Sequence, residues 1–158
     1  MINTASLLIF ALFTSAFTAS AQNARLAGTW NLNLDRSKHV ALPAGYQVSS
    51  RITSDAPKLQ IVMNLVNPNG ETRTEDWKLI TNGRDYDGTF NGQPAQISAR
   101  WDGDVLVNHI AYTKRDGAKA EVTRHLTLSG DGRTLTVNFT ETIGGQAEEG
   151  LEIWTKQE

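Results

Sequence analysis

Short turn signals recur at close intervals along this chain, and they constrain its fold more than any other feature. They stand between runs in which apolar and polar residues alternate, at Asn82-Gly83, Asn91-Gly92, Asp102-Gly103, Asp116-Gly117 and Asp131-Gly132. Type I′ hairpin turns require positive φ angles, which Asn, Asp and Gly tolerate, so each dipeptide predicts a β-hairpin. The spacing predicts an antiparallel all-β meander.

The hairpin registers can be checked, because the apolar residues of two paired strands must lie on the same face. The turns pair Ile52 with Ile61 across Ala56-Pro57, Leu79 with Tyr86, Tyr86 with Ile97, Ala99 with Leu106, and Leu128 with Leu135. At Asp116-Gly117-Ala118 a three-residue loop with a bulge keeps the faces matched. That loop pairs Ile110 with Arg124 and sets His109 opposite His125.

Ten strands follow from these turns, and no segment among them shows a helical period. We expect the strands at residues 28–34, 47–54, 58–66, 71–80, 84–90, 95–101, 104–113, 119–129, 133–142 and 149–156. An open meander leaves two exposed edges, so we expect about eight to ten strands to close into a barrel. The segment 35–46 is either a lid over the mouth or a connector.

The start of the chain predicts export. An apolar run of about 11 residues, Leu7 to Phe17, precedes the small-residue site Ala19-Ser20-Ala21, which is typical of a signal peptide. The run is well short of the roughly 20 residues that span a bilayer. We therefore expect a signal peptide at 1–21, one barrel domain at 22–158, and a periplasmic or secreted location.

Composition excludes several classes of function. The chain has no cysteine, which excludes disulfides, thiolate metal sites and a cysteine nucleophile. Its net charge is −2 and it has no cluster of basic residues, so it is a poor candidate for binding nucleic acid or an anionic membrane surface. We expect neither a nucleic-acid partner nor stable membrane insertion, and the sequence implies no cofactor.

The segment Gly28-Thr29-Trp30, the meander order, the size and the ending Trp154-Thr155-Lys156 together resemble the calycin superfamily of lipocalins and fatty-acid-binding proteins. The chain also looks like lipocalin-like secreted proteins of environmental bacteria. The resemblance implies that Trp30 packs against a basic residue at the closed end, with Arg124 or Arg25 as the candidates. It does not imply a fatty acid, because the last strand lacks the family's Arg-x-Tyr anchor.

The predicted interior is largely apolar, and it includes Leu151 and Ile153 on the last strand. Such a barrel is either filled by its own side chains or left open to hold one small ligand. If it is open, aromatic side chains form the walls and a few polar ones orient the ligand. The candidate ligand-binding residues are Arg124, Asn108, Tyr112, Trp77, Trp101, Tyr86 and Ser50.

Arg124 is the candidate with the strongest physical argument, because a charged group on an apolar face needs a partner. It would bind a ligand's anionic oxygen, or instead stack on Trp30 or pair with Glu75 or Glu141. We favour the structural interpretation, since ion pairs of this kind are common. By parity Arg73 and Glu75 also face inward, but they lie near a strand end. We therefore expect them to form a solvated pair at the rim of the barrel.

No catalytic or metal-binding motif is present, so we expect no catalytic residue and no metal site. The paired His109 and His125 would need a further ligand, from His39 or a carboxylate, and ordinary surface histidines explain them more simply. Three hypotheses remain. The first is an exported barrel that binds a small apolar or amphipathic molecule. The second is a structural or protein-interaction module with a filled interior. The weakest is an enzyme in which Tyr112 is the acid.

Overall fold

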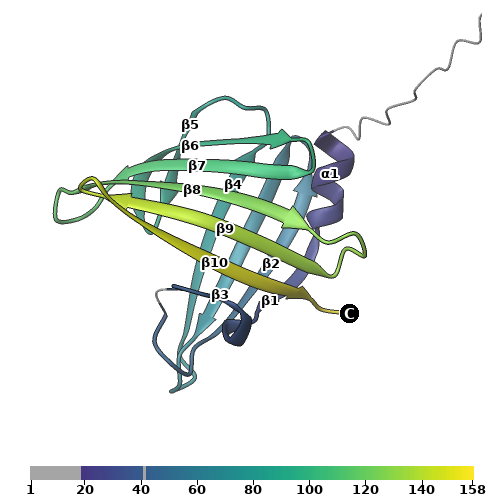
Figure 1. Ribbon diagram of the computed structural model, residues 1–158, viewed down its shortest axis with the longest axis horizontal. Coiled ribbons are helices and arrows are strands. Elements are labelled where there is room, and N and C mark those ends of the chain that lie inside the picture. The colour runs from purple at the N-terminus through teal and green to yellow at the C-terminus, as the bar shows by residue number, and fades with distance from the viewer. Residues whose placement is uncertain (1–18, 41) are drawn as a thin grey trace, which may run out of the picture.

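A computed structural model describes residues 19–40 and 42–158 of the protein, and it shows a nearly closed barrel of ten antiparallel strands (Figure 1). The strands are β1 (Gly28–Leu32), β2 (Gln47–Asp55), β3 (Lys58–Val66), β4 (Thr72–Ile80), β5 (Tyr86–Phe90), β6 (Gln93–Asp102), β7 (Val105–Thr113), β8 (Lys119–Leu128), β9 (Thr134–Ile143) and β10 (Gln146–Lys156). Helix α1 (Ala19–Leu26) precedes them, and the 3₁₀ turn η1 (Leu34–Arg36) follows β1.

Each strand pairs with its sequence neighbours except at one place. The order is β4-β3-β2-β1-β10-β9-β8-β7-β6-β5, so β1 pairs with β10 and the sheet remains unpaired between β4 and β5. The predicted hairpin at Asn82-Gly83 is therefore wrong. Residues 81–85 form a loop in which Gly83 N donates to Ala99 O of β6 (2.9 Å), which draws the loop away from a tight turn.

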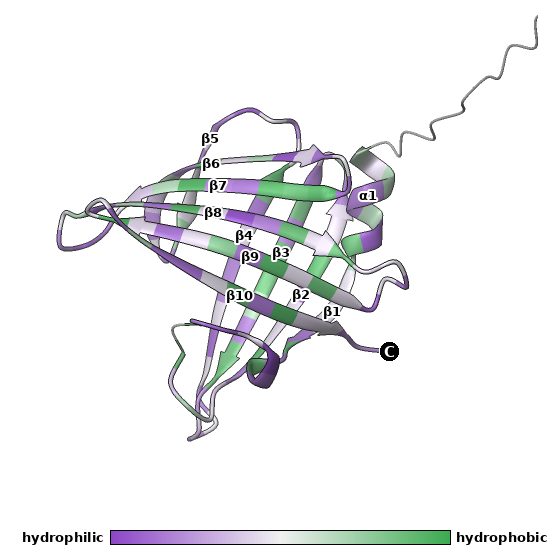
Figure 2. Cartoon of the chain, in the orientation of Figure 1, coloured by the Kyte–Doolittle hydropathy of each residue, from purple (hydrophilic) through white to green (hydrophobic). Residues whose placement is uncertain are grey.

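Along the strands hydrophobic and hydrophilic residues alternate (Figure 2), and the buried set forms one core. The predicted pairs Ile52 with Ile61, Tyr86 with Ile97 and Leu128 with Leu135 are confirmed. These registers agree because each turn is short and one face is clearly apolar.

Two strand pairings, β6 with β7 and β7 with β8, are shifted by two residues from the predicted register. A shift of two keeps the side chains of these strands on their predicted faces. In the first, Leu106 lies opposite Trp101 rather than Ala99, because the turn falls at Gly103-Asp104. In the second, five residues, 114–118, separate the paired Thr113 and Lys119, so Ile110 lies opposite Val122 and not Arg124. A slip of two preserves the inside and the outside, but it changes which side chains touch.

Helix α1 is not predicted by the sequence pattern, and it seals one end of the barrel. Its buried face carries Gln22, Asn23 and Leu26. Asn23 Nδ2 donates to Thr81 Oγ1 (3.0 Å), and Asn23 Oδ1 accepts from Trp101 Nε1 (2.8 Å). Each of these bonds joins the helix to a distant strand or loop, so tertiary packing holds a segment whose own periodicity is too short to predict.

The last carbonyls of α1 are also occupied. Trp30 Nε1 donates to Leu26 O (2.9 Å) and Lys156 Nζ to Arg25 O (3.4 Å). The Lys156 ammonium lies 5.1 Å from the centroid of the Trp30 ring, which has no exposed surface. The basic residue that the resemblance implied against Trp30 is thus Lys156, its register partner on β10, and not Arg124 or Arg25.

The predicted interior parity of β10 is also wrong. Trp154 lies opposite the core residue Leu135 and belongs to the core cluster, and Glu152 lies opposite Val137. Leu151 and Ile153 therefore lie on the outer face, beside the chain that continues from β1. That chain runs along the edge of β10, with a bond from Asn33 N to Ile153 O (2.8 Å) and an antiparallel bridge between residues 38 and 151.

The segment after β1 crosses the end of the barrel opposite α1 (Figure 1). Asn33 caps η1 by accepting from Arg36 N (3.1 Å), and Ser37 Oγ accepts from Ile153 N (3.0 Å). Val40 and Leu42 then line the barrel interior, which makes residues 37–40 and 42–46 a strap over the mouth rather than a bare connector.

The predicted signal run Leu7 to Phe17 lies outside the described residues. Within the described ones no helix has the length and apolar character needed to cross a membrane.

Candidate functional site

A cavity of about 240 Å³ lies inside the barrel below the strap. This is slightly smaller than the roughly 300–1,000 Å³ of pockets that hold drug-sized ligands. Its apolar wall consists of Leu32, Val40, Leu42, Val48, Met63, Leu65, Trp77, Phe90, Val122, Phe139 and Trp154. Its polar lining consists of His39, Glu75, Asn91, Arg124, Glu141, Glu148, Glu149 and Glu152.

Gly150 makes room for one wall of this cavity. It lies opposite Phe139 on the β9–β10 ladder, and a Cβ at this position would overlap the Phe139 ring. The missing side chain lets the phenyl ring lie across β10. Glycine in a strand interior often marks such a close approach.

Arg124 is the central polar residue of the cavity. Its guanidinium lies 5.0 Å from the centroid of the Trp77 ring, and its Nη2 lies 3.5 Å from Glu152 Oε1. Glu152 is held in turn by Trp154 Nε1, which donates to Oε2 (3.0 Å). The side chains of Arg124 and Glu152 are only 19% and 12% exposed, so this pair is largely shielded from water.

The predicted partners of Arg124 are therefore wrong, although the expectation that it needs one is right. It stacks on Trp77 and not Trp30, and among the described residues its ion-pair partner is Glu152 rather than Glu75 or Glu141. Two nitrogens nevertheless stay unused. Arg124 Nε and Trp77 Nε1 are buried and have no hydrogen-bond partner in the described part of the chain.

Tyr112 lies at the edge of the same network. Its hydroxyl donates to Glu141 Oε1 (3.2 Å), and its ring meets Phe90 edge-on at a centroid distance of 5.3 Å. Burial, and then the neighbouring Glu141 charge, raise the pKa of Tyr112 above its ordinary value of 10.0. The phenol consequently stays protonated at neutral pH and acts as a hydrogen-bond donor.

Of the other predicted ligand-binding residues, none lines this cavity. Asn108 is 2% exposed and donates to Ser98 O (3.0 Å), although it lies directly across the ladder from Arg124. Trp101 is bound to Asn23 at the sealed end. Ser50 is buried on β2 opposite Met63, which does line the cavity.

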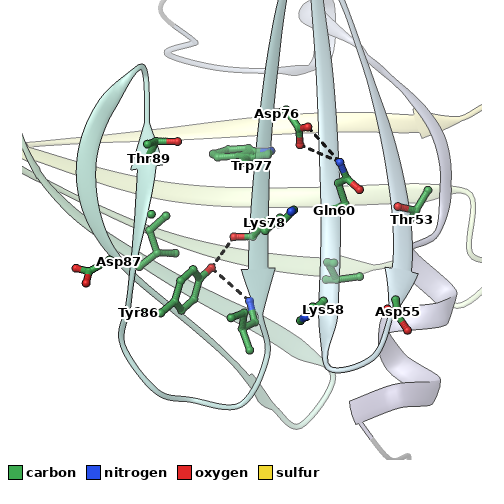
Figure 3. Close-up of a pocket in the computed structure, with 14 residues that line it drawn as sticks. Thr53, Asp55, Lys58, Gln60, Asp76, Trp77, Lys78, Tyr86, Asp87 and Thr89 are labelled. Carbon is green, nitrogen blue, oxygen red and sulfur yellow. Dashed lines mark hydrogen bonds between the residues drawn. The ribbon is translucent and has the colours of Figure 1, made fainter.

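Tyr86 has a different place, in the gap between β4 and β5. Figure 3 shows its hydroxyl reaching the unpaired edge of β4, where it donates to Lys78 O (2.5 Å) and accepts from Ile80 N (3.3 Å). Burial raises its pKa above the ordinary value of 10.0, despite the opposing bond from Ile80. One phenol thus replaces part of the missing strand pairing.

A groove follows this gap on the outside of the barrel. Its lining residues include Thr53, Gln60, Asp76, Trp77, Tyr86, Asp87 and Thr89. Figure 3 shows Trp77 lying between β4 and β5, and the same indole lines the interior cavity. Trp77 is therefore the partition between the groove and the cavity.

Sequence reasoning misses Glu152, Trp154 and the strap residues. It assigns Glu152 to the outside because Leu151 and Ile153 carry the stronger apolar signal on β10. The alternative signal is Trp154, whose size favours an interior position in a strand of that parity. The predicted pairing of His109 with His125 is also wrong, since His109 lies opposite Thr123 and its Nδ1 lies 3.2 Å from Thr123 Oγ1.

In the described part of the chain, no three metal-binding side chains converge. The predicted rim pair of Arg73 and Glu75 is present at 2.6 Å, with the arginine 66% exposed. An ion pair so open to solvent contributes little to stability.

Comparison with known proteins places the fold, although no protein-family model matches the chain. Lipid binding protein 8 of Caenorhabditis elegans superposes with a TM-score of 0.55 at 11% identity, covering 84% of this chain and 96% of that one. The zebrafish ileal bile acid-binding protein complexed with cholic acid superposes with a TM-score of 0.51 at 12% identity, covering 84% of this chain and 99% of that one. Secretory abundant heat soluble protein 4 of Ramazzottius varieornatus superposes with a TM-score of 0.54 at 14% identity, covering 85% of this chain and 96% of that one.

These neighbours are barrels of the calycin type, so the lipocalin-like fold expected from the sequence is confirmed. At such identities the likeness concerns the fold alone.

Proposed function

We propose that this protein is an exported, non-enzymatic barrel that binds one small, mostly apolar molecule in the cavity below the strap. The observation that carries this proposal is the cavity itself. It joins an apolar wall to a small set of converging polar groups, which is the usual make-up of a ligand site. Two of its buried donors, Arg124 Nε and Trp77 Nε1, lack within residues 19–40 and 42–158 the partner that buried donors normally have.

The structural neighbours support the same proposal in a general way. Two of them are named for binding lipids or bile acids, and their barrels have this fold. A fold does not fix a function, so this support is an analogy. The geometry of the cavity is the stronger ground.

The exposure of the residues on either side of Ala21 supports export with cleavage after Ala21. Ala19 and Ser20 are exposed, whereas Gln22 and Asn23 are buried against the barrel. Removal of residues 1–21 would leave the sealing contacts of Gln22 and Asn23 in place. Intact-mass measurement of the protein recovered from the periplasm or medium tests this, and a chain that starts elsewhere contradicts it.

The binding proposal is tested by native mass spectrometry of the purified protein beside a denaturing spectrum. We expect extra mass that disappears on denaturation. A neutral dye such as N-phenyl-1-naphthylamine then reports occupancy, because its fluorescence rises in an apolar site.

Two matched variants locate the dye. Met63→Trp adds bulk to the cavity wall, and Val62→Trp adds similar bulk to the outer face of the same strand. We expect Met63→Trp to abolish dye binding and Val62→Trp to retain it, with circular dichroism confirming that both are folded. If neither the native protein nor Val62→Trp binds dye or co-purified mass, the interior is filled, and the interaction-module hypothesis takes its place.

A further inference from the structure

Two buried hydrogen-bond donors, on side chains that line the cavity, have no acceptor among the described residues. They are Trp77 Nε1 and Arg124 Nε, and they belong to side chains that stack at 5.0 Å. A buried donor left without a partner is costly, and native proteins rarely leave two such donors together. Both side chains line the cavity, so the part of it beside the stacked pair lacks an acceptor atom, which a ligand oxygen would supply.

The charges around this spot determine what kind of oxygen fits. Five glutamates line the cavity, and among its described lining residues Arg124 is the only arginine or lysine. Arg124 is already paired with Glu152, which Trp154 holds in place. A ligand carboxylate here would meet the negative charge of Glu141, Glu148 and Glu149, which no arginine or lysine among the described lining residues balances.

A cationic group fits no better at this spot, because it brings donors to a place where two donors are already unsatisfied. An uncharged acceptor meets both conditions. It accepts from the indole and guanidinium nitrogens, and it adds no charge to the acidic lining.

We propose that the cavity selects apolar molecules whose polar end is an uncharged oxygen acceptor, such as an alcohol, ester or ketone, over the carboxylate of the same skeleton. This inference rests on the proposed function and names its ligand class. In it, Trp77 and Arg124 bind the ligand oxygen, and Glu152 disfavours acids by occupying the guanidinium.

The test uses one short chain with four polar ends: octan-1-ol, methyl octanoate, octanoate and octylamine. Each is titrated at pH 7 into the full folded protein, and binding is followed by calorimetry. We expect the alcohol and the ester to bind at least about tenfold more tightly than octanoate, a ratio that corresponds to removal of one favourable polar contact and addition of repulsion.

Three variants probe the residues. Glu152→Gln frees the guanidinium and lowers the negative charge, so octanoate should gain about tenfold in affinity relative to octan-1-ol. Glu121→Gln removes the same charge from the exposed outer face of β8 and should leave that ratio unchanged. Trp77→Phe keeps a ring but removes the indole donor, and should weaken the alcohol about fivefold.

The outcomes separate this inference from the proposed function. If none of the four molecules binds and the neutral dye also fails, both are overturned. If octanoate or octylamine binds as tightly as the alcohol, the protein is a ligand-binding barrel but the preference for neutral acceptors is wrong. That preference is equally wrong if Glu152→Gln and Glu121→Gln change the acid-to-alcohol ratio by the same factor.

Discussion

One buried amide ties the sealed end of the barrel together, and the cost of removing it follows from its contacts. Asn23 has no exposed surface, and it accepts from Trp101 Nε1 and donates to Thr81 Oγ1. Asn23→Ala leaves the indole N–H without its acceptor, at about 1–3 kcal/mol, and deletes a second bond worth about 1 kcal/mol. The higher helix propensity of alanine returns about 0.5 kcal/mol.

Because the Trp101 indole is only partly buried, the cost of leaving its N–H without an acceptor lies at the low end of that range. We therefore expect Asn23→Ala to lower the free energy of unfolding by about 1.5 kcal/mol. Urea denaturation followed by circular dichroism and tryptophan fluorescence measures this value. Gln22→Ala is the matched control. It loses one bond to Gly103 O (2.6 Å) and should cost about 1 kcal/mol.

A double-mutant cycle checks the mechanism. If the indole bond carries the effect, Trp101→Phe and Asn23→Ala should be non-additive, with a coupling energy of about 1 kcal/mol. A loss below about 0.5 kcal/mol for Asn23→Ala, or two costs that simply add, would refute the view that this amide seals the barrel.

Further predictions concern the two ends of the barrel and the phenol. Gly150→Ala should cost about 1–3 kcal/mol in urea denaturation, since its Cβ clashes with Phe139, whereas Gly130→Ala meets nothing within 4 Å and should be close to neutral. Lys156→Met removes the cation above a buried indole and should lower stability by about 1 kcal/mol. The raised pKa of Tyr112 gives stability that is fully present below pH 10 and is lost as pH rises through the folded pKa. Tyr112→Phe should therefore flatten the plot of unfolding free energy against pH above pH 10. An unchanged plot would contradict this.

The strand boundaries are predictable because the information is local. Each hairpin couples a turn dipeptide to an alternating run, and a register error of two residues leaves the faces unchanged. That is why Trp77 and Arg124 can be placed inside from the sequence even though the predicted register sets Arg124 two residues off, opposite Ile110 instead of Asn108.

The parts that fail depend on contacts between distant segments. Helix α1 forms against Trp101 and Thr81, far from it in sequence, and eight residues are too short for a helical period to appear. The local alternation of β10 favours Leu151 inside and Glu152 outside, yet Ile153 on the outer face is only 7% exposed, where the chain from β1 pairs with this strand. Local pattern alone cannot distinguish a covered exterior from an interior.

The two ends of the barrel treat buried polar groups in opposite ways, and this difference is the best guide to function. At the sealed end the donors find protein acceptors: the Trp101 indole has Asn23, and the Trp30 indole has Leu26 O. Below the strap, Trp77 and Arg124 each keep a buried nitrogen that no acceptor of the described residues reaches. Proteins tend to break the rules of local consistency at functional sites and to obey them elsewhere. A chain that satisfies its polar groups at one end has the means to do so at the other, so the unsatisfied pair supports the proposal that a ligand oxygen binds there.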